Sequence, residues 1–138
     1  MPVQPYLNFP GTCEEAVRFY QSVFSTEAPE TMRFSDMPAD PEYPLPEEAA
    51  DRILHTRLTI AGTTVMFSDT FPGMEHTVGT NVTLAVLTDS RENVKQWFHA
   101  LAENGTVGME LQETFWSPLY GTVTDRFGIS WQFNLESD

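Results

Sequence analysis

Residues 12–24, TCEEAVRFYQSVF, have the same pattern of polar and apolar residues as residues 89–101, DSRENVKQWFHAL. The offset between matched positions is constant, because 89 − 12 and 101 − 24 both equal 77. Each stretch has a polar first residue, a glutamate three residues later, and apolar residues at helical spacing. The matched pairs are Thr12 with Asp89, Glu15 with Glu92, Val17 with Val94, Tyr20 with Trp97, and Phe24 with Leu101. A repeated supersecondary unit predicts two similar modules that together enclose a site.

The two halves predict the same order of elements. The first half predicts a strand, a helix and three strands, at residues 3–9, 12–24, 31–36, 53–60 and 63–69. The second half repeats this order at residues 81–87, 89–102, 107–113, 120–125 and 129–135. A capping box at Thr12 and an Asp89 cap mark the helix starts, and Ala61-Gly62 marks a hairpin.

These patterns predict an α+β fold of two βαβββ modules whose curved mixed sheets each form a half-barrel cup. We expect one domain over residues 1–138, with module one at 1–70, a linker at 71–78 and module two at 79–138. Residues 37–51 contain four prolines and are predicted to be a loop. This loop is either a lid over the cup or a plain solvated excursion.

Composition excludes several classes of partner. The formal net charge is −13, with 7 Lys and Arg against 20 Asp and Glu, so nucleic acid and anionic membranes are not expected partners. No apolar run is long enough to span a membrane, and no secretory signal is evident. The single Cys13 forbids an internal disulfide. We therefore expect a cytoplasmic protein.

Strand alternation divides the side chains into an oily face, which must meet the helices, and a polar face. The polar face carries few Lys and Glu, which a solvated face normally collects. Its amide, hydroxyl and imidazole groups suit an enclosed, mildly polar pocket. The alternative is an ordinary solvated sheet face. The ligand-binding residues predicted on this reasoning, together with those taken from the matches discussed below, are Tyr6, Asn8, Arg57, Met66, Ser68, Asn81, Trp116 and Gln132.

His55 is the only histidine predicted on the polar face and is the candidate catalytic residue, as a general acid or base. Its alternative role is structural, within the strand ladder. Arg57 shares the face and would clamp an anionic ligand, or else form a salt bridge. Asp36 and Asp69 would join His55 in a displaced metal site or an acid–base pair, or would cap turns.

Trp116 follows Phe115 where regular structure is predicted to break. An exposed aromatic residue in such a place packs over a ligand or a partner chain. Filling of the core is the alternative role.

The chain resembles the vicinal oxygen chelate superfamily of glyoxalase I, bleomycin-resistance proteins and extradiol dioxygenases. The closer resemblance is to its PhnB-like branch, often labelled 3-demethylubiquinone-9 3-methyltransferase. The segments that carry it are PYLNF at 5–9, CEEA at 13–16 with Phe19 and Tyr20, MRFSDMP at 32–38, His55, Ser68-Asp69, TFW at 114–116, and DRFGISW at 125–131. The resemblance implies the predicted fold and a homodimer.

In metal-dependent members of that superfamily, each module supplies a His or Gln near the start of its first strand and a Glu in its last strand. The matching positions here are Gln4 or Pro5, Met66, Asn81 and Gln132. None is a histidine or a carboxylate, so we expect the family metal site to be lost.

We therefore expect a metal-independent small-molecule binding protein of the bleomycin-resistance type, without a cofactor and with an unidentified ligand. The alternative is an enzyme that uses His55 as acid or base, with or without a divalent metal held by Asp36 or Asp69. A third hypothesis is an interaction module with a vestigial cup. The chain lacks nucleotide and S-adenosylmethionine fingerprints and is short for a methyltransferase, so the family label is interpreted as a name and not an activity.

Overall fold

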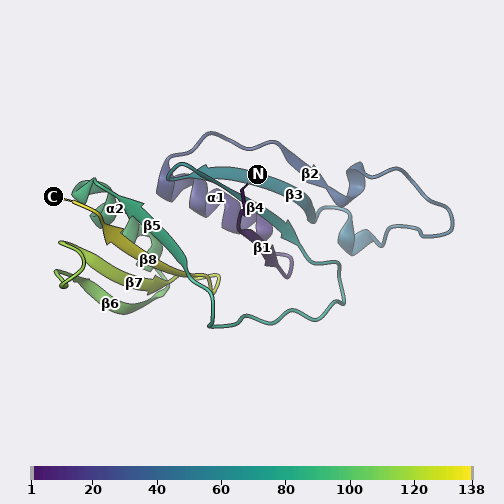
Figure 1. Ribbon diagram of the computed structural model, residues 1–138. Coiled ribbons are helices and arrows are strands. Elements are labelled where there is room, and N and C mark those ends of the chain that lie inside the picture. Colours follow the sequence, from purple (N-terminus) through teal and green to yellow (C-terminus); the bar gives the residue numbers. More distant parts are fainter. Residues whose placement is uncertain (1, 138) are drawn as a thin grey trace. The chain divides into compact units, whose positions relative to one another are not determined.

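The computed structural model describes residues 2–137, which form two compact units, one ending at His76 and the next beginning at Thr77. Each unit is a four-stranded mixed sheet that carries one long helix (Figure 1). The predicted α+β fold of two βαβββ modules is confirmed. Within residues 2–137, no helix is long and apolar enough to cross a membrane.

The first unit has its strands in the spatial order β1-β4-β3-β2, with β1 parallel to β4 and the other pairs antiparallel. Helix α1 packs against β3 and β4 (Figure 1). The elements are β1 (Tyr6–Phe9), α1 (Cys13–Phe24), β2 (Thr31–Arg33), the 3-10 helices η1 (Phe34–Asp36) and η2 (Glu47–Ala49), β3 (Ile53–Ile60) and β4 (Thr63–Asp69).

The core of the first unit lies between α1 and the oily face of its sheet. Tyr20 of α1 stacks on Phe67 of β4, with ring centroids 5.9 Å apart, and Phe9 of β1 also stacks on Phe67, at 6.3 Å. All three residues are almost fully buried, as helical spacing predicts for Tyr20 and strand alternation predicts for the two phenylalanines.

Two local predictions for this unit are wrong. The Thr12 side chain makes no capping hydrogen bond, although α1 does begin at Cys13. The register between β2 and β3 shifts next to Met32, so that Ile53 is buried and Leu54, which alternation assigned to the oily face, is only partly covered. An extra residue in one strand reverses the side-chain alternation, and this is the physical reason for the second error.

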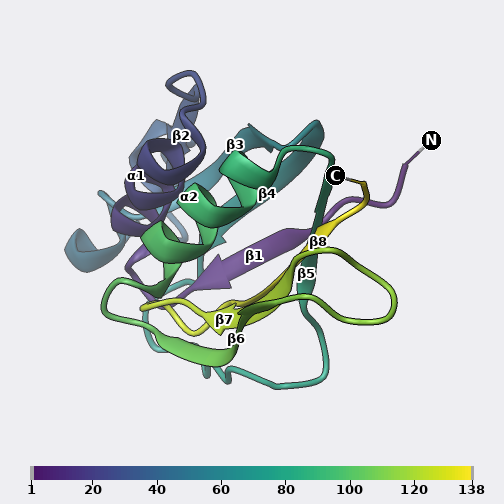
Figure 2. The ribbon, with the colours of Figure 1, turned by 90° about the vertical axis from the view of Figure 1, so that its left-hand side faces the viewer.

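The second unit repeats the topology, with the spatial order β5-β8-β7-β6 and β5 parallel to β8. Helix α2 packs against its sheet (Figure 2). The elements are β5 (Leu84–Thr88), α2 (Arg91–Ala102), β6 (Thr106–Gln112), β7 (Tyr120–Thr124) and β8 (Ser130–Leu135).

The helix start of the second unit also differs from the prediction. Ser90, and not Asp89, is the N-cap residue of α2, and its hydroxyl accepts a hydrogen bond from the Asn93 backbone N–H at 3.2 Å. After the helix, Asn104 adopts a left-handed φ of 59°. The next residue is Gly105, where a Cβ would lie 2.4 Å from the Thr124 carbonyl oxygen, so close backbone approach requires a glycine there.

The core of the second unit contains a buried polar anchor. Trp131 of β8 donates its indole N–H to Asp125 Oδ2 at 2.9 Å, and both residues are buried. The other oxygen of Asp125 accepts the backbone N–H groups of Phe127 and Ile129 at 2.8 and 3.1 Å, which fixes the turn between β7 and β8. The carboxylate therefore serves the turn and the core together.

Candidate functional site

The strand register of the first sheet gathers predicted site residues on the face opposite α1. Met66 of β4 pairs with Tyr6 of β1 on one side and with Arg57 of β3 on the other. Asn8 and Ser68 form the next pair of β1 and β4 on the same face. Side chains that alternate along neighbouring strands share a face, so these five residues form one surface, which we call the polar face of the first sheet.

His55 joins this face through Tyr6. The Tyr6 hydroxyl oxygen lies 3.0 Å from His55 Nδ1, within hydrogen-bonding distance, and the two rings have centroids 5.6 Å apart. Because β4 lies between β1 and β3, the contact passes over β4. The imidazole is thereby held over the middle of the sheet, in a partly exposed position.

Asn8 is held in place by two neighbours. The Ser68 hydroxyl donates to Asn8 Oδ1 at 3.1 Å. His76 Nε2 lies 2.9 Å from the backbone oxygen of Asn8, so a second imidazole reaches β1. No sequence pattern indicates His76, because it lies in an irregular connection where no alternation assigns a side chain to a face.

Arg57 is exposed and, among residues 2–137, has no hydrogen-bond or ion-pair partner. The salt bridge considered for it is therefore not formed within these residues, despite the excess of acids in the chain. By contrast, Arg33 binds Glu14 and also donates to the Asp51 carbonyl oxygen at 2.7 Å. Arg57 thus offers all its guanidinium donors to an external anion.

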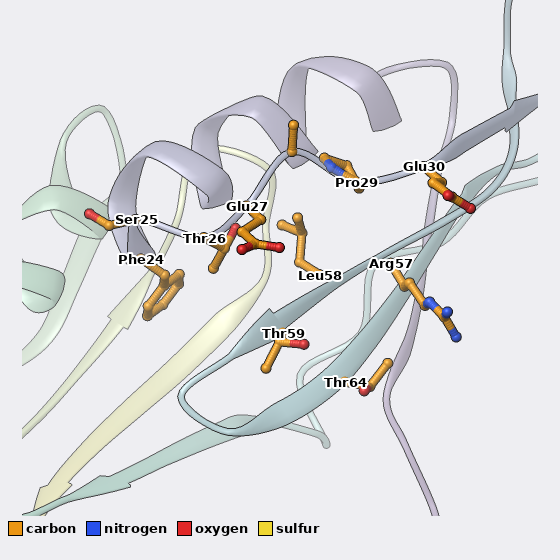
Figure 3. Close-up of a pocket in the computed structure, with 11 residues that line it drawn as sticks. Phe24, Ser25, Thr26, Glu27, Pro29, Glu30, Arg57, Leu58, Thr59 and Thr64 are labelled. Carbon is orange, nitrogen blue, oxygen red and sulfur yellow. The ribbon is translucent and has the colours of Figure 1, made fainter.

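A cavity of about 770 Å³ is lined by Arg57 and its neighbours on β3 and by the connection after α1. Figure 3 shows Leu58 pointing toward that connection, whereas Arg57, from the same strand, points away from it. Thr59 and Thr64 add hydroxyl groups on the sheet side, and Glu27 adds a carboxylate from the connection. One side of this cavity, which carries polar groups, therefore lies beside the unpaired guanidinium of Arg57.

The two aspartates proposed for a displaced site have backbone partners. Asp69 is buried, and its two oxygens accept the backbone N–H groups of Gly11, Cys13 and Ile53, each at 2.9 Å. Asp36 accepts the backbone N–H of Arg33 at 2.8 Å. Capping of turns, the alternative considered for both, fits these contacts, and Asp69 in addition caps the start of α1.

The second sheet has a hydrogen-bonded polar row of its own. Gln132 accepts from the Tyr120 hydroxyl at 3.0 Å and donates to the Thr83 hydroxyl at 2.8 Å. Asn81, predicted to be in the same strand as Thr83, is exposed and precedes β5, which begins only at Leu84. The structure therefore gives Gln132 partners on its own sheet and leaves Asn81 in the connection.

Trp116 lies beside this row. Its ring contacts Tyr120 edge-on, with centroids 5.1 Å apart, and contacts Phe115 at 4.8 Å. Trp116 is 51% exposed and Phe115 is 97% exposed. Core filling, the alternative considered for this pair, does not describe such exposed rings.

The residues at the family metal positions do not fit a divalent ion. Gln4 and Met66 are partly covered, Asn81 is exposed, and the amide of Gln132 is engaged with Tyr120 and Thr83. Amide oxygens and a thioether without carboxylate, imidazole or thiolate are poor ligands for a hard cation. In the described part of the chain, no group of three or more His, Cys, Asp or Glu is placed to hold a metal ion.

The fold and the arrangement of the sheets define the class of protein. Two βαβββ units with open mixed sheets are the glyoxalase/bleomycin resistance fold. The chain is structurally similar to a glyoxylase/bleomycin resistance protein/dioxygenase domain from Frankia, with a TM-score of 0.63, 10% identity, and coverage of 98% of this chain and 96% of that one.

The chain belongs to the family described as 3-demethylubiquinone-9 3-methyltransferase, whose sequence model matches residues 2–134. It is 35% identical to protein YjdN of Escherichia coli K12, over 98% of this chain and 95% of the relative. It is also similar to the crystal structure of PA1353 from Pseudomonas aeruginosa, with a TM-score of 0.86, 34% identity, and coverage of 100% and 99% of the two chains. The family resemblance seen in the sequence is thereby confirmed.

Proposed function

We propose that this protein binds a small molecule that carries an anionic group, and that it does so on the polar face of the first sheet without the metal site of the family. The observation that carries the proposal is Arg57, an exposed guanidinium without a protein partner among residues 2–137. It lies one strand away from Met66 and two strands away from Tyr6 on the same surface.

The side chains of this face suit a ligand that joins an anionic group to a less polar body. A guanidinium presents a planar fork of donors that matches a carboxylate, phosphate or phosphonate. Polar groups of Tyr6, His55 and the Asn8 side-chain amide would orient the remainder, and the Met66 thioether gives an adaptable apolar floor. Because the chain carries a net charge of −13, an anionic ligand needs a local positive charge to offset the surrounding acids, and the unpaired Arg57 guanidinium supplies one on this face.

The experiment is a thermal-shift screen of carboxylates, phosphates and phosphonates, followed by calorimetric titration of the best ligand. Arg57→Ala is expected to weaken its binding about tenfold or more, since a charged hydrogen-bonding group is worth roughly 1.5–3 kcal/mol. Arg57→Lys is expected to recover only part of the affinity, because an ammonium lacks the planar fork.

Arg18→Ala is the matched control, because Arg18 is an exposed arginine of α1 that pairs with Glu14. This substitution should leave the affinity unchanged. Equal affinity in the Arg57→Ala and parent proteins would refute the proposed site. So would a ligand whose binding both arginine substitutions weaken equally, because that ligand would be responding only to net charge.

An enzyme that uses His55 is the second candidate, and the contact between Tyr6 and His55 favours it. A phenol at 3.0 Å from Nδ1 fixes the ring and leaves Nε2 as the atom that exchanges a proton with a substrate. The test is product formation from the bound ligand, monitored by mass spectrometry. Catalysis predicts that His55→Gln abolishes turnover while the dissociation constant changes little, whereas a ligand recovered unaltered from the parent protein favours simple binding.

We also propose that two copies of the chain associate through the surface around Phe115. A phenylalanine that is 97% exposed and contacts a half-exposed Trp116 is an aromatic pair typical of interfaces. Light scattering during size exclusion should give twice the mass of one chain. Phe115→Ser should shift the mass toward that of the monomer, and Tyr43→Ser, at another exposed aromatic residue, should not. A monomeric parent protein would contradict this proposal.

A further inference from the structure

The proline-rich segment after β2 encloses a second hollow in the first unit. A cavity of about 1030 Å³, which we call the loop cavity, is bounded by residues 34–46 and by Phe71, which follows β4. The sequence predicts a loop here, either a lid over the cup or a solvated excursion. In the structure, residues of this loop also line a pocket together with Phe71.

The walls of the loop cavity are mainly aromatic and apolar. The rings of Phe34 and Phe71 meet edge to face, with centroids 5.7 Å apart. Tyr43 is 77% exposed and lines the cavity together with Met37 and Leu45, both also exposed. So much uncovered apolar surface in one pocket is typical of a binding site.

The charges of the loop cavity are all negative. Asp40 and Glu42 line it, and none of its lining residues is Lys, Arg or His. Asp40 uses one oxygen to accept the Glu42 backbone N–H at 3.0 Å, which holds both carboxylates on the same turn. Arg52, the basic residue that follows this segment, donates instead to the Thr70 carbonyl oxygen at 2.9 Å and is not part of the lining.

We propose that the loop cavity binds an organic cation with an apolar body, such as an aromatic quaternary ammonium. The electron-rich faces of aromatic rings attract a weakly hydrated cation, and the two carboxylates supply the opposite charge. An anion would be repelled by Asp40 and Glu42, and a neutral apolar molecule would gain only the contact with the rings. The chemistry is thus opposite to that of the site proposed around Arg57, and the two sites are independent.

The test uses benzyltrimethylammonium as the probe, with benzyl alcohol and phenylacetate as neutral and anionic comparisons. Titration followed by amide NMR shifts should show saturable changes confined to residues 34–46 and around Phe71 for the cation. The two comparison compounds should bind at least about tenfold more weakly. Equal shifts from all three compounds would overturn the charge argument, and shifts elsewhere on the chain would overturn the site.

Substitutions separate the rings from the charges. Tyr43→Ala, at an exposed position, should lower the affinity for the cation by about tenfold. The double variant Asp40→Asn with Glu42→Gln should lower it by about the same factor. Glu48→Gln is the matched control, because Glu48 belongs to the same acidic segment but does not line the cavity. Arg57→Ala should leave cation binding unchanged, so failure of the anion site and failure of this site are distinguishable. Unchanged affinity in both cavity variants would refute the proposal.

Discussion

The carboxylate of Asp69, at the end of β4, caps the N-terminus of α1 by accepting the backbone N–H of Cys13 at 2.9 Å. The same side chain accepts from Gly11 and Ile53, so one buried residue connects the helix start, the turn before it and the first residue of β3. Asp69→Asn should lower the free energy of unfolding by on the order of 2–4 kcal/mol, because an amide leaves a buried N–H without an acceptor. Urea denaturation followed by circular dichroism measures this loss.

Asp36→Asn is the control for that substitution. Asp36 accepts one backbone N–H on an exposed surface, so its loss should be under about 1 kcal/mol. If both variants lost the same small amount of stability, Asp69 would not have the capping role described here.

Cys13 is expected to be unreactive in the folded protein. Burial, together with the negative charges of Asp69 and Glu14, raises the pKa of its thiol above the ordinary value. The thiolate is the reactive form, so alkylation by iodoacetamide at mildly alkaline pH should be at least about 100-fold slower than in denaturant. Mass spectrometry of timed samples measures the ratio. Rapid labelling under native conditions would show that the helix start opens readily.

The capping of α1 separates what a local sequence pattern predicts from what depends on contacts between distant residues. A Thr-x-x-Glu pattern is a local signal and placed the helix correctly, within a residue. The group that caps the helix is Asp69, more than fifty residues away, and no local pattern connects these two positions. Alternation likewise predicted the bounds of β3 and β4 correctly, but the bulge beside Met32 decided that Ile53 would be buried in place of Leu54.

The candidate site likewise combines features that the sequence pattern predicts with features that depend on how the strands are arranged. Alternation placed Tyr6, His55 and Arg57 on one face, and the register confirms that they share it. The hydrogen bond between Tyr6 and His55 crosses a strand, and so it depends on a sheet order that the sequence does not state. Asn81 was assigned to a strand that begins three residues later, because strand ends are set by pairing as well as by propensity.

The ion pair between Glu14 and Arg33 should give a small stability that depends on pH. The hydrogen bond from Arg33 lowers the pKa of the Glu14 carboxyl below its ordinary value of 4.5. A lowered pKa in the folded state means that the stabilisation is complete above 4.5 and is lost as the pH falls below that value through the folded-state pKa. Glu14→Gln should therefore cost less than about 1 kcal/mol at neutral pH, since the side chains of the pair are 33% and 42% exposed and solvent screens the charges.

Urea denaturation of the parent and Glu14→Gln proteins over a series of pH values tests this. The difference between them should disappear in acid. Glu15→Gln is a neighbouring control at an exposed position, and its difference should show no such dependence. A Glu14→Gln difference that persists unchanged in acid would exclude the ion pair as its cause.

The turn between β3 and β4 offers a stabilising substitution. Ala61 and Gly62 have φ values of 48° and 88°, so both central residues of this two-residue hairpin are left-handed. An alanine is strained there, whereas Asn-Gly is the preferred pair for such a turn. Ala61→Asn should raise the free energy of unfolding by about 0.5–1 kcal/mol, and Ala61→Val, which introduces a β-branched side chain, should lower it.

Gly62→Ala should also lower the free energy of unfolding, by about 1 kcal/mol. Because no atom lies within 4 Å of the added Cβ, that loss would measure backbone strain alone. Thermal and urea denaturation of the three variants give the signs, and a destabilised Ala61→Asn protein would show that the turn has a different conformation.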